Sequence, residues 1–163
     1  MLKKILYVLL AAIIVIQFIH PERNKTQAMQ PNNLGNVHLI PENVQSILTK
    51  ACLDCHSNKT RYPWYTSLQP VDWWIAGHIK NAKKQINFDE YSNRSLRYQF
   101  HKMEEIVEQV KDGKMPLDSY TWIHKDAILT EVEKNTLINW ATAVQDSMKA
   151  KYPIDSLIRK KQS

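Results

Sequence analysis

Apolar residues recur at helical spacing along much of this chain. Four segments show the pattern, with apolar positions three or four residues apart, so that they fall on one face of an α-helix. These segments are residues 41–51, 71–84, 95–112 and 131–150. Few stretches alternate apolar and polar residues as a half-buried strand does, and the chain holds only three glycines. The pattern therefore predicts an all-α fold with about four helices.

Residue types at the ends of these segments support the assignment. Pro41 and Pro70 stand where helices are expected to begin, and Gly113 stands where the third is expected to end. Thr130 and Glu133 have the spacing of a capping box, which predicts the start of the fourth helix. The buried face of that helix is expected to hold Val132, Leu137, Trp140, Ala141 and Val144.

The N-terminus has the pattern of an export signal. Lys3 and Lys4 precede an apolar run at residues 5–19, and no small-residue cleavage site follows the run directly. The run is shorter than the roughly 20 residues that usually span a bilayer. We expect residues 1–20 to be either a cleaved signal peptide or an uncleaved membrane anchor, and we favour the anchor. Both alternatives predict that the rest of the chain lies in the periplasm, anchored to the inner membrane if residues 5–19 are retained.

Composition divides residues 21–163 into three segments. Residues 21–39 are polar and hold proline and glycine, which predicts a linker, and residues 40–152 are long enough for one small domain. Residues 153–163 are predicted to form a flexible tail. Residues 1–30 carry four basic side chains and one acidic, so they supply half of the net charge of +6. The domain is therefore only mildly basic, and we do not expect it to bind nucleic acid.

Residues 52–56 read Cys-Leu-Asp-Cys-His, and they hold the only two cysteines of the chain. C-x-x-C-H is the signature of c-type haem attachment. Two thiols at this spacing can each form a thioether with one vinyl group of the porphyrin, and the adjacent imidazole becomes an axial ligand of the iron. The motif therefore predicts one covalent haem c, attached to Cys52 and Cys55, with His56 as a metal ligand.

Other interpretations of the cysteine pair stay open. A dithiol redox pair is usually found near a βαβ pattern, which we do not find. A zinc site needs four ligands, and the chain offers no second C-x-x-C and no H-x₃₋₅-H. A disulfide across two residues would close a very small loop and stabilise the chain little.

The sixth iron ligand is predicted to be Met115. It follows a helix in the sequence Gly-Lys-Met-Pro-Leu, where a loop could bring the thioether to the haem face opposite His56. His78 is the alternative, because it shares the inward stripe of its helix with Trp74. An open or water-bound position is a further possibility.

Aromatic residues gather close to the motif, and Trp64 and Trp74 are predicted to form part of a haem pocket wall. They can equally belong to an ordinary core, since Trp and Tyr contribute much of the burial in a small domain. Arg61 is a candidate partner for a haem propionate, although such a charge is often simply solvated.

Several stretches resemble one known family. They read CLDCHSNKTRYPWY (52–65), PVDWWIAGHIK (70–80), INF (86–88), KMPLDSY (114–120), HKDAILT (124–130) and WA (140–141). Together they resemble the small bacterial haem-binding domain family with a C-x-x-C-H motif, which is cytochrome c-like and exported. The resemblance spans about residues 41–144. It implies a helical c-type haem domain with Cys52 and Cys55 as attachment sites and His56 as proximal ligand.

The chain departs from the resemblance at Ala82 and Tyr91, where we expect a small glycine and a tryptophan. These differences leave the detail of the pocket open.

The function expected from these features is single-electron transfer by a small cytochrome c-like domain wrapped around its haem, with an unidentified redox protein as partner. An electron carrier is favoured over an enzyme. The alternative is a haem-based peroxidase or a gas or redox sensor, which would need an exchangeable sixth ligand. We recognise no distal His–Arg pair of the peroxidase kind in the sequence.

Overall fold

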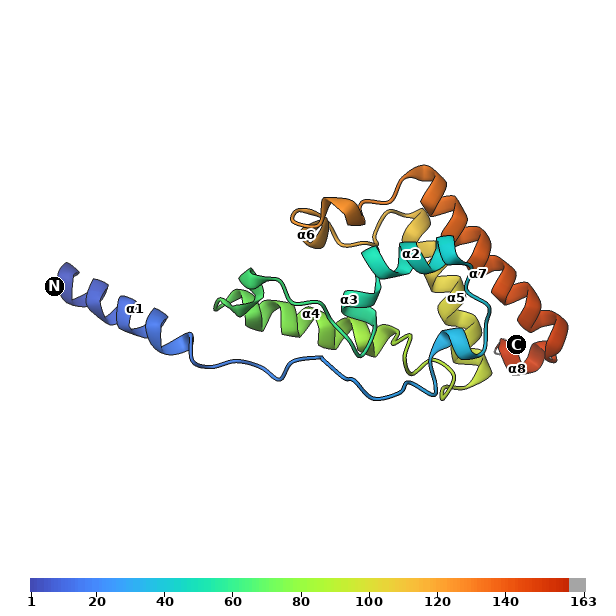
Figure 1. The fold of residues 1–163 in the computed structure, drawn as a ribbon, viewed down its shortest axis with the longest axis horizontal. Helices are drawn as coiled ribbons and strands as arrows, with labels where there is room; N and C mark the ends of the chain where they lie inside the picture. Colours follow the sequence, from blue (N-terminus) through green and yellow to red (C-terminus); the bar gives the residue numbers. More distant parts are fainter. Residues whose placement is uncertain (159–163) are drawn as a thin grey trace, which may run out of the picture.

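The computed structural model describes residues 1–158, which are helical with no strand among them (Figure 1). The α-helices are α1 (Leu2–Ile16), α2 (Glu42–Ala51), α3 (Leu53–His56), α4 (Val71–Gln85), α5 (Leu96–Lys111), α6 (Asp118–Thr121), α7 (Glu131–Lys151) and α8 (Ile154–Leu157). Short 3₁₀ helices are η1 (Leu34–Asn36), η2 (Trp64–Ser67) and η3 (Lys125–Ala127). The all-α prediction is confirmed.

The four predicted helices correspond to α2, α4, α5 and α7, and their ends carry the expected caps. At the start of α7, the Thr130 hydroxyl accepts a hydrogen bond from the Glu133 N–H, and the Glu133 carboxylate accepts one from the Thr130 N–H. After α5, Gly113 adopts φ of 67°, a conformation in which a residue without Cβ meets little steric cost.

The hydrophobic core lies mainly between α5 and α7, with α2 packed against α7. Of the predicted buried face of α7, Leu137, Trp140, Ala141 and Val144 are buried. Val132 is 75% exposed, so its predicted burial is wrong. At about 100° per residue, Val132 lies on the opposite side of the helix from Ala141, which is fully buried.

Residues 21–39, predicted as a linker, run along the body of the molecule. Leu34 is buried, and its N–H donates to the carbonyl oxygen of Phe88 at 2.8 Å. The side chain of Asn24 donates to the Ser57 carbonyl oxygen and to the Thr60 hydroxyl. This segment therefore contributes to the packing of the domain.

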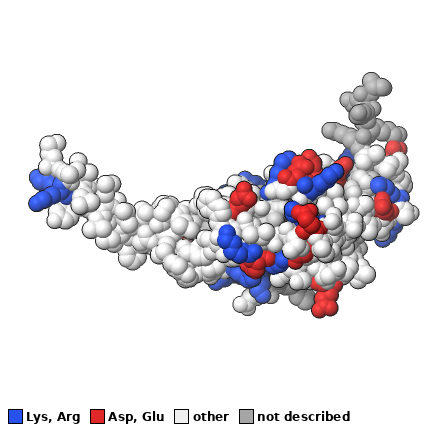
Figure 2. Space-filling view, turned by 90° about the horizontal axis from the view of Figure 1, so that it is seen from above, with Lys and Arg blue, Asp and Glu red and all other residues white. Residues whose placement is uncertain are grey.

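The predicted flexible tail, residues 153–163, begins with α8, whose Leu157 is buried in the core. Residues 159–163 lie outside the described residues. Helix α1 extends away from the body and buries none of its residues (Figure 1). Figure 2 shows basic side chains at the free end of α1 and white atoms along the rest of it.

Within residues 1–158, no helix combines the length and the apolar character needed to cross a membrane. The signal or anchor function of residues 1–20 stays a prediction, as do the domain boundaries.

Replacing Thr130 with alanine removes the side-chain cap of α7. We expect Thr130→Ala to lower the free energy of unfolding by about 1 kcal/mol, because an N–H at the start of the helix loses its acceptor. Urea unfolding followed by circular dichroism measures the change. Thr142→Ala is the matched control, since Thr142 is exposed within the same helix and bonds only to the Ile138 carbonyl. Equal stability losses in the two variants would contradict the capping role.

Candidate functional site

A cavity of about 590 Å³ opens among the main helices. Its walls come from the end of α2, from α3, α4, α5 and α7, and from the loop that precedes α6. This volume lies within the range of roughly 300–1,000 Å³ typical of cofactor pockets. The apolar part of the wall includes Leu48, Ile86, Phe88, Val110 and Leu137.

The C-x-x-C-H motif faces this cavity because a new helical turn begins at its first cysteine. Helix α2 ends at Ala51, and the His56 N–H donates to the Cys52 carbonyl oxygen at 3.0 Å, which closes the single turn of α3. Residues three and four positions apart on a helix share a face. Cys52, Cys55 and His56 accordingly all line the cavity.

The two thiols are free and poorly suited to redox exchange. Burial raises the pKa of Cys52 to about 12 and that of Cys55 to about 11. Thiol–disulfide exchange needs the thiolate, and redox-active cysteines have lowered pKa values. The dithiol interpretation therefore finds no support here. The zinc interpretation finds none either, because residues 1–158 contain no cluster of three or more His, Cys, Asp or Glu side chains suited to hold a metal.

His56 is held by the segment that follows α4. Its Nδ1 lies 3.0 Å from the carbonyl oxygen of Ile86, which can only accept, so Nδ1 carries the hydrogen. Burial lowers the pKa of His56, which favours the neutral imidazole. Phe88 contacts the ring edge-on, and its N–H donates to the His56 carbonyl oxygen at 2.8 Å. The arrangement leaves the lone pair of Nε2 available to a metal.

Both candidate sixth ligands line the same cavity. The N–H groups of Lys114 and Met115 donate to the Gln109 carbonyl oxygen, at 2.9 and 3.2 Å, and so fix the start of the Met115 loop against the end of α5. His78 lies on α4, where its ring contacts Trp74 edge-on with centroids 4.3 Å apart. The structure thus brings Cys52, Cys55, His56, Met115 and His78 together.

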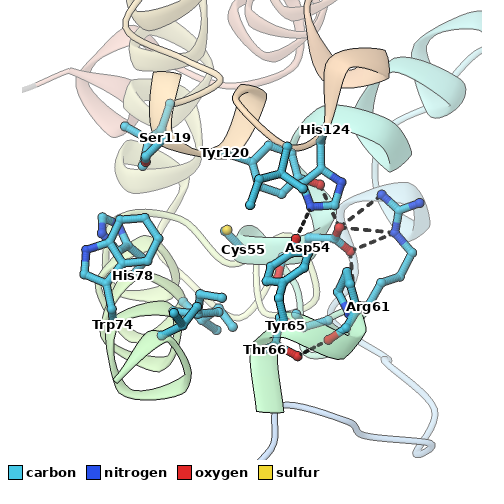
Figure 3. Close-up of a pocket in the computed structure, with 17 residues that line it drawn as sticks. Asp54, Cys55, Arg61, Tyr65, Thr66, Trp74, His78, Ser119, Tyr120 and His124 are labelled. Atoms are coloured by element: carbon cyan, nitrogen blue, oxygen red, sulfur yellow. Dashed lines mark hydrogen bonds and ion pairs between the residues drawn. The ribbon is translucent and has the colours of Figure 1, made fainter. Parts of the chain in front are cut away.

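The other predicted site residues lie elsewhere. Trp64, on η2, is 78% exposed and does not line the cavity. Arg61 and Trp74 line a second pocket of about 90 Å³ (Figure 3). This smaller pocket adjoins the larger cavity, because Cys55, His78, Leu117 and Tyr120 contribute to the walls of both. The structure therefore does not bring Trp64, Trp74 or Arg61 to the large cavity, and Trp74, predicted on the inward stripe of α4, is 51% exposed.

Asp54, which lies between the two cysteines, connects the motif to the rest of the site. Its buried carboxylate accepts hydrogen bonds from the Arg61 guanidinium at 3.0–3.1 Å and from the Tyr120 hydroxyl at 2.7 Å (Figure 3). The bond to Asp54 also raises the pKa of Arg61. Because Tyr120 lies on α6, just after the Met115 loop, the carboxylate joins the two sides of the cavity.

His124 extends this network. Its ring stacks on Tyr120 with centroids 4.2 Å apart, and its Nε2 lies 2.7 Å from the Tyr65 hydroxyl oxygen. Sequence reasoning missed the roles of Asp54 and Tyr120. The position of Asp54 inside the motif was a usable signal, since a carboxylate in a buried turn needs a partner. Nothing in the local sequence marks Tyr120 as that partner.

Lys102 is a further residue that the sequence did not reveal. It is buried on α5, lines the large cavity and forms an ion pair with Glu105. Lysine is rarely buried, so its position in a helix of mixed polarity predicts exposure. Among the described residues that line the cavity, Lys102 is the one lysine or arginine.

The residues present fit a haem. The cavity has the volume of a cofactor pocket and a partly apolar wall, and Cys52, Cys55 and His56 line it. A methionine and a second histidine provide candidate ligands for the remaining axial position.

Comparison with known proteins agrees with this geometry. Residues 11–143 match a family described as a haem-binding domain. No curated protein and no solved structure matches the chain. The matched range covers most of the chain and includes the motif and both candidate sixth ligands. It begins about thirty residues before the stretch of the chain in which the sequence resembles this family. The predicted family is thereby confirmed, and this chain belongs to the haem-binding domain family.

Proposed function

We propose that this chain is an exported c-type cytochrome domain, periplasmic or anchored to the membrane by residues 5–19, that holds one haem covalently and transfers single electrons. One observation carries the proposal. Both cysteines and the histidine of the C-x-x-C-H motif face a single cavity of cofactor size, and the histidine is fixed so that its Nε2 is free.

Each residue has a distinct function in this proposal. Cys52 and Cys55 anchor the haem by thioether bonds, and His56 supplies Nε2 to the iron. When bound, the haem supplies an iron that exchanges one electron between its ferric and ferrous states. The apolar part of the wall would pack against the porphyrin, and Lys102, which pairs with Glu105, would bring a positive charge near a propionate.

Met115 is the proposed sixth ligand. The start of the loop that carries it is fixed by hydrogen bonds to the Gln109 carbonyl oxygen. The loop is followed by α6, whose Tyr120 hydroxyl donates to the Asp54 carboxylate. A loop held at both ends suits a site whose ligands do not change with redox state. His78 stays the alternative, because it lines the same cavity from α4.

A haem-based peroxidase or sensor was the alternative function. It would need an exchangeable axial position and, for peroxide chemistry, the distal histidine–arginine pair of peroxidases. No arginine lines the cavity in the described part of the chain. We therefore favour electron transfer, and rapid carbon monoxide binding by the reduced protein would favour the alternative.

Export is proposed from the N-terminal pattern, since Lys3 and Lys4 lie in the first turn of α1 and precede its apolar run. The periplasm is the compartment in which bacteria attach haem to C-x-x-C-H motifs, so the proposed location and the proposed cofactor support each other.

Substituting the cysteines tests covalent attachment. In a host with cytochrome c maturation factors, we expect the unaltered chain to keep its haem through acid–acetone extraction. Cys55→Ser should retain the haem through one thioether, and its reduced pyridine spectrum should shift to longer wavelength because one vinyl group stays unsaturated. Cys52→Ser/Cys55→Ser should release all of its haem. Full extraction of haem from the unaltered chain would contradict the proposal.

Substituting the candidate axial ligands tests the iron site. We expect Met115→Ala to abolish the weak far-red ferric band that accompanies methionine–iron bonding and to lower the midpoint potential, because thioether sulfur stabilises ferrous iron. Met29→Ala is the control, since Met29 is 93% exposed and does not line the cavity. If His78→Ala abolishes six-coordination while Met115→Ala leaves it intact, Met115 is not the ligand.

A further inference from the structure

An exposed apolar face occupies the end of the body from which α1 departs. It is formed by η2 and the residue after it, the first turn of α4, and the two residues that follow α6. These segments lie close together, because each of them or a residue next to it lines the smaller pocket. We call it the aromatic face and define it as Trp64, Leu68, Trp73, Trp74, Trp122 and Ile123. Trp64 is 78% exposed and Trp122 is 74% exposed. Figure 1 shows α1 leaving from this end.

The segments that form this face have almost no charge. Residues 62–77 contain a single charged side chain, Asp72, which is 1% exposed and paired with His20 and Arg23. Residues 119–124 contain no Lys, Arg, Asp or Glu. Surfaces of soluble domains normally intersperse charges, and contiguous exposed apolar patches mark places of interaction.

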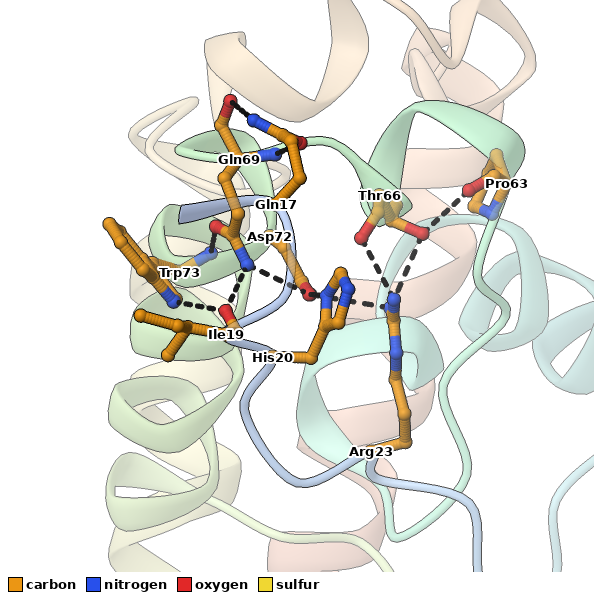
Figure 4. A network of polar contacts seen from close by, with 9 residues as sticks. All are labelled: Gln17, Ile19, His20, Arg23, Pro63, Thr66, Gln69, Asp72 and Trp73. Carbon is orange, nitrogen blue, oxygen red and sulfur yellow. Dashed lines mark hydrogen bonds and ion pairs between the residues drawn. The ribbon is translucent and has the colours of Figure 1, made fainter. Parts of the chain in front are cut away.

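The C-terminal end of α1 is joined directly to the aromatic face (Figure 4). The Gln69 N–H donates to Gln17 Oε1 at 3.0 Å, and Gln17 Nε2 donates to the Gln69 carbonyl oxygen at 3.3 Å. The Ile19 carbonyl oxygen accepts from Trp73 Nε1 at 2.9 Å and from Gln69 Nε2 at 2.7 Å. These bonds set the end of the apolar helix beside the exposed indole rings.

We propose that the aromatic face lies against the surface of the lipid bilayer that α1 enters. This inference rests on the membrane anchoring in the proposed function. The 15 residues of α1 extend about 22 Å, less than the roughly 30 Å of a bilayer hydrocarbon core. A helix this short keeps its end within the membrane interface, and the side chains bonded to that end meet lipid headgroups.

The chemistry of the face suits this occupant. Trp side chains concentrate at membrane–water interfaces, where an apolar ring and a polar N–H are both accommodated. A protein partner would not explain why the aromatic face adjoins the apolar helix α1. A bilayer would cover the apolar surface of α1 and the aromatic face together. The consequence is a fixed orientation, with the cofactor cavity held close to the membrane.

The test uses the full, haem-loaded chain in nanodiscs of phosphatidylethanolamine and phosphatidylglycerol, with 5-fluorotryptophan incorporated and the iron reduced. Single Trp→Phe variants assign the fluorine signals. We expect lipids with a nitroxide near the headgroup to broaden the signals of Trp64 and Trp122, and a water-soluble gadolinium chelate to leave them sharp. Trp140 is the internal control, since it is buried on α7 and should respond to neither agent.

A double variant makes the test sharper. In Trp64→Gln/Trp122→Gln we expect the signals of Trp73 and Trp74 to lose most of their lipid broadening, while the haem spectrum is unchanged. Val132→Gln is the matched control, because Val132 is an equally exposed apolar residue on α7. It should leave the broadening of Trp73 and Trp74 unaltered.

The outcomes separate the inference from the proposed function. If the gadolinium chelate broadens the Trp64 and Trp122 signals while the chain stays with the nanodiscs, the inference is overturned and the anchor still stands. A chain that does not stay with the nanodiscs would overturn the anchor and the inference together. Neither result bears on the haem, whose spectrum is recorded on the same sample.

Discussion

The hydrogen bond between His56 Nδ1 and the carbonyl oxygen of Ile86 places the imidazole hydrogen on Nδ1 and leaves Nε2 with its lone pair. Without a fixed acceptor, a histidine at the end of a four-residue helix could rotate and change tautomer. The bond removes that freedom, and burial keeps the ring neutral by lowering its pKa. A buried, neutral imidazole with one nitrogen already bonded is in the state required of a metal ligand. The remainder of the site is arranged around this fixed ring.

Asp54 lies on the same short helix as His56 and links α3 to α6. A buried carboxylate is costly unless it is paired, and here both oxygens bond to Arg61 while one also accepts from Tyr120. The pairing holds α3 against α6 and so limits how far the Met115 loop can move. The proposed axial ligands therefore belong to one connected structure, although they are far apart in the sequence.

The helices and the motif were open to prediction because their signals are local. A capping box at Thr130 and Glu133, a glycine after α5 and apolar residues at helical spacing each act within a few residues. The error at Val132 arose because apolar character alone does not fix the side of a helix that is buried. Its angular position relative to Ala141 held the missing information.

The residues that complete the site were less accessible to sequence reasoning. Arg61 was expected beside a propionate, yet the structure pairs it with Asp54, seven positions earlier. The bond from Tyr120 to Asp54 joins residues that only the tertiary fold brings together. Lys102 follows an ordinary helical pattern, and its burial depends on the cavity beside it. The sequence of residues 21–39 predicts a linker because it lacks helical periodicity, and its contacts, such as the bonds from Asn24 to Ser57 and Thr60, join residues far apart in the sequence.

The central claim is that Cys52, Cys55 and His56 hold one covalent haem. The most direct measurement is the intact mass of the full chain, purified from a host that installs haem on exported C-x-x-C-H motifs. The account predicts the mass of the polypeptide plus one haem, with the added mass located on the peptide that contains both cysteines. A polypeptide of unmodified mass, or one with the two cysteines joined as a disulfide, would contradict it.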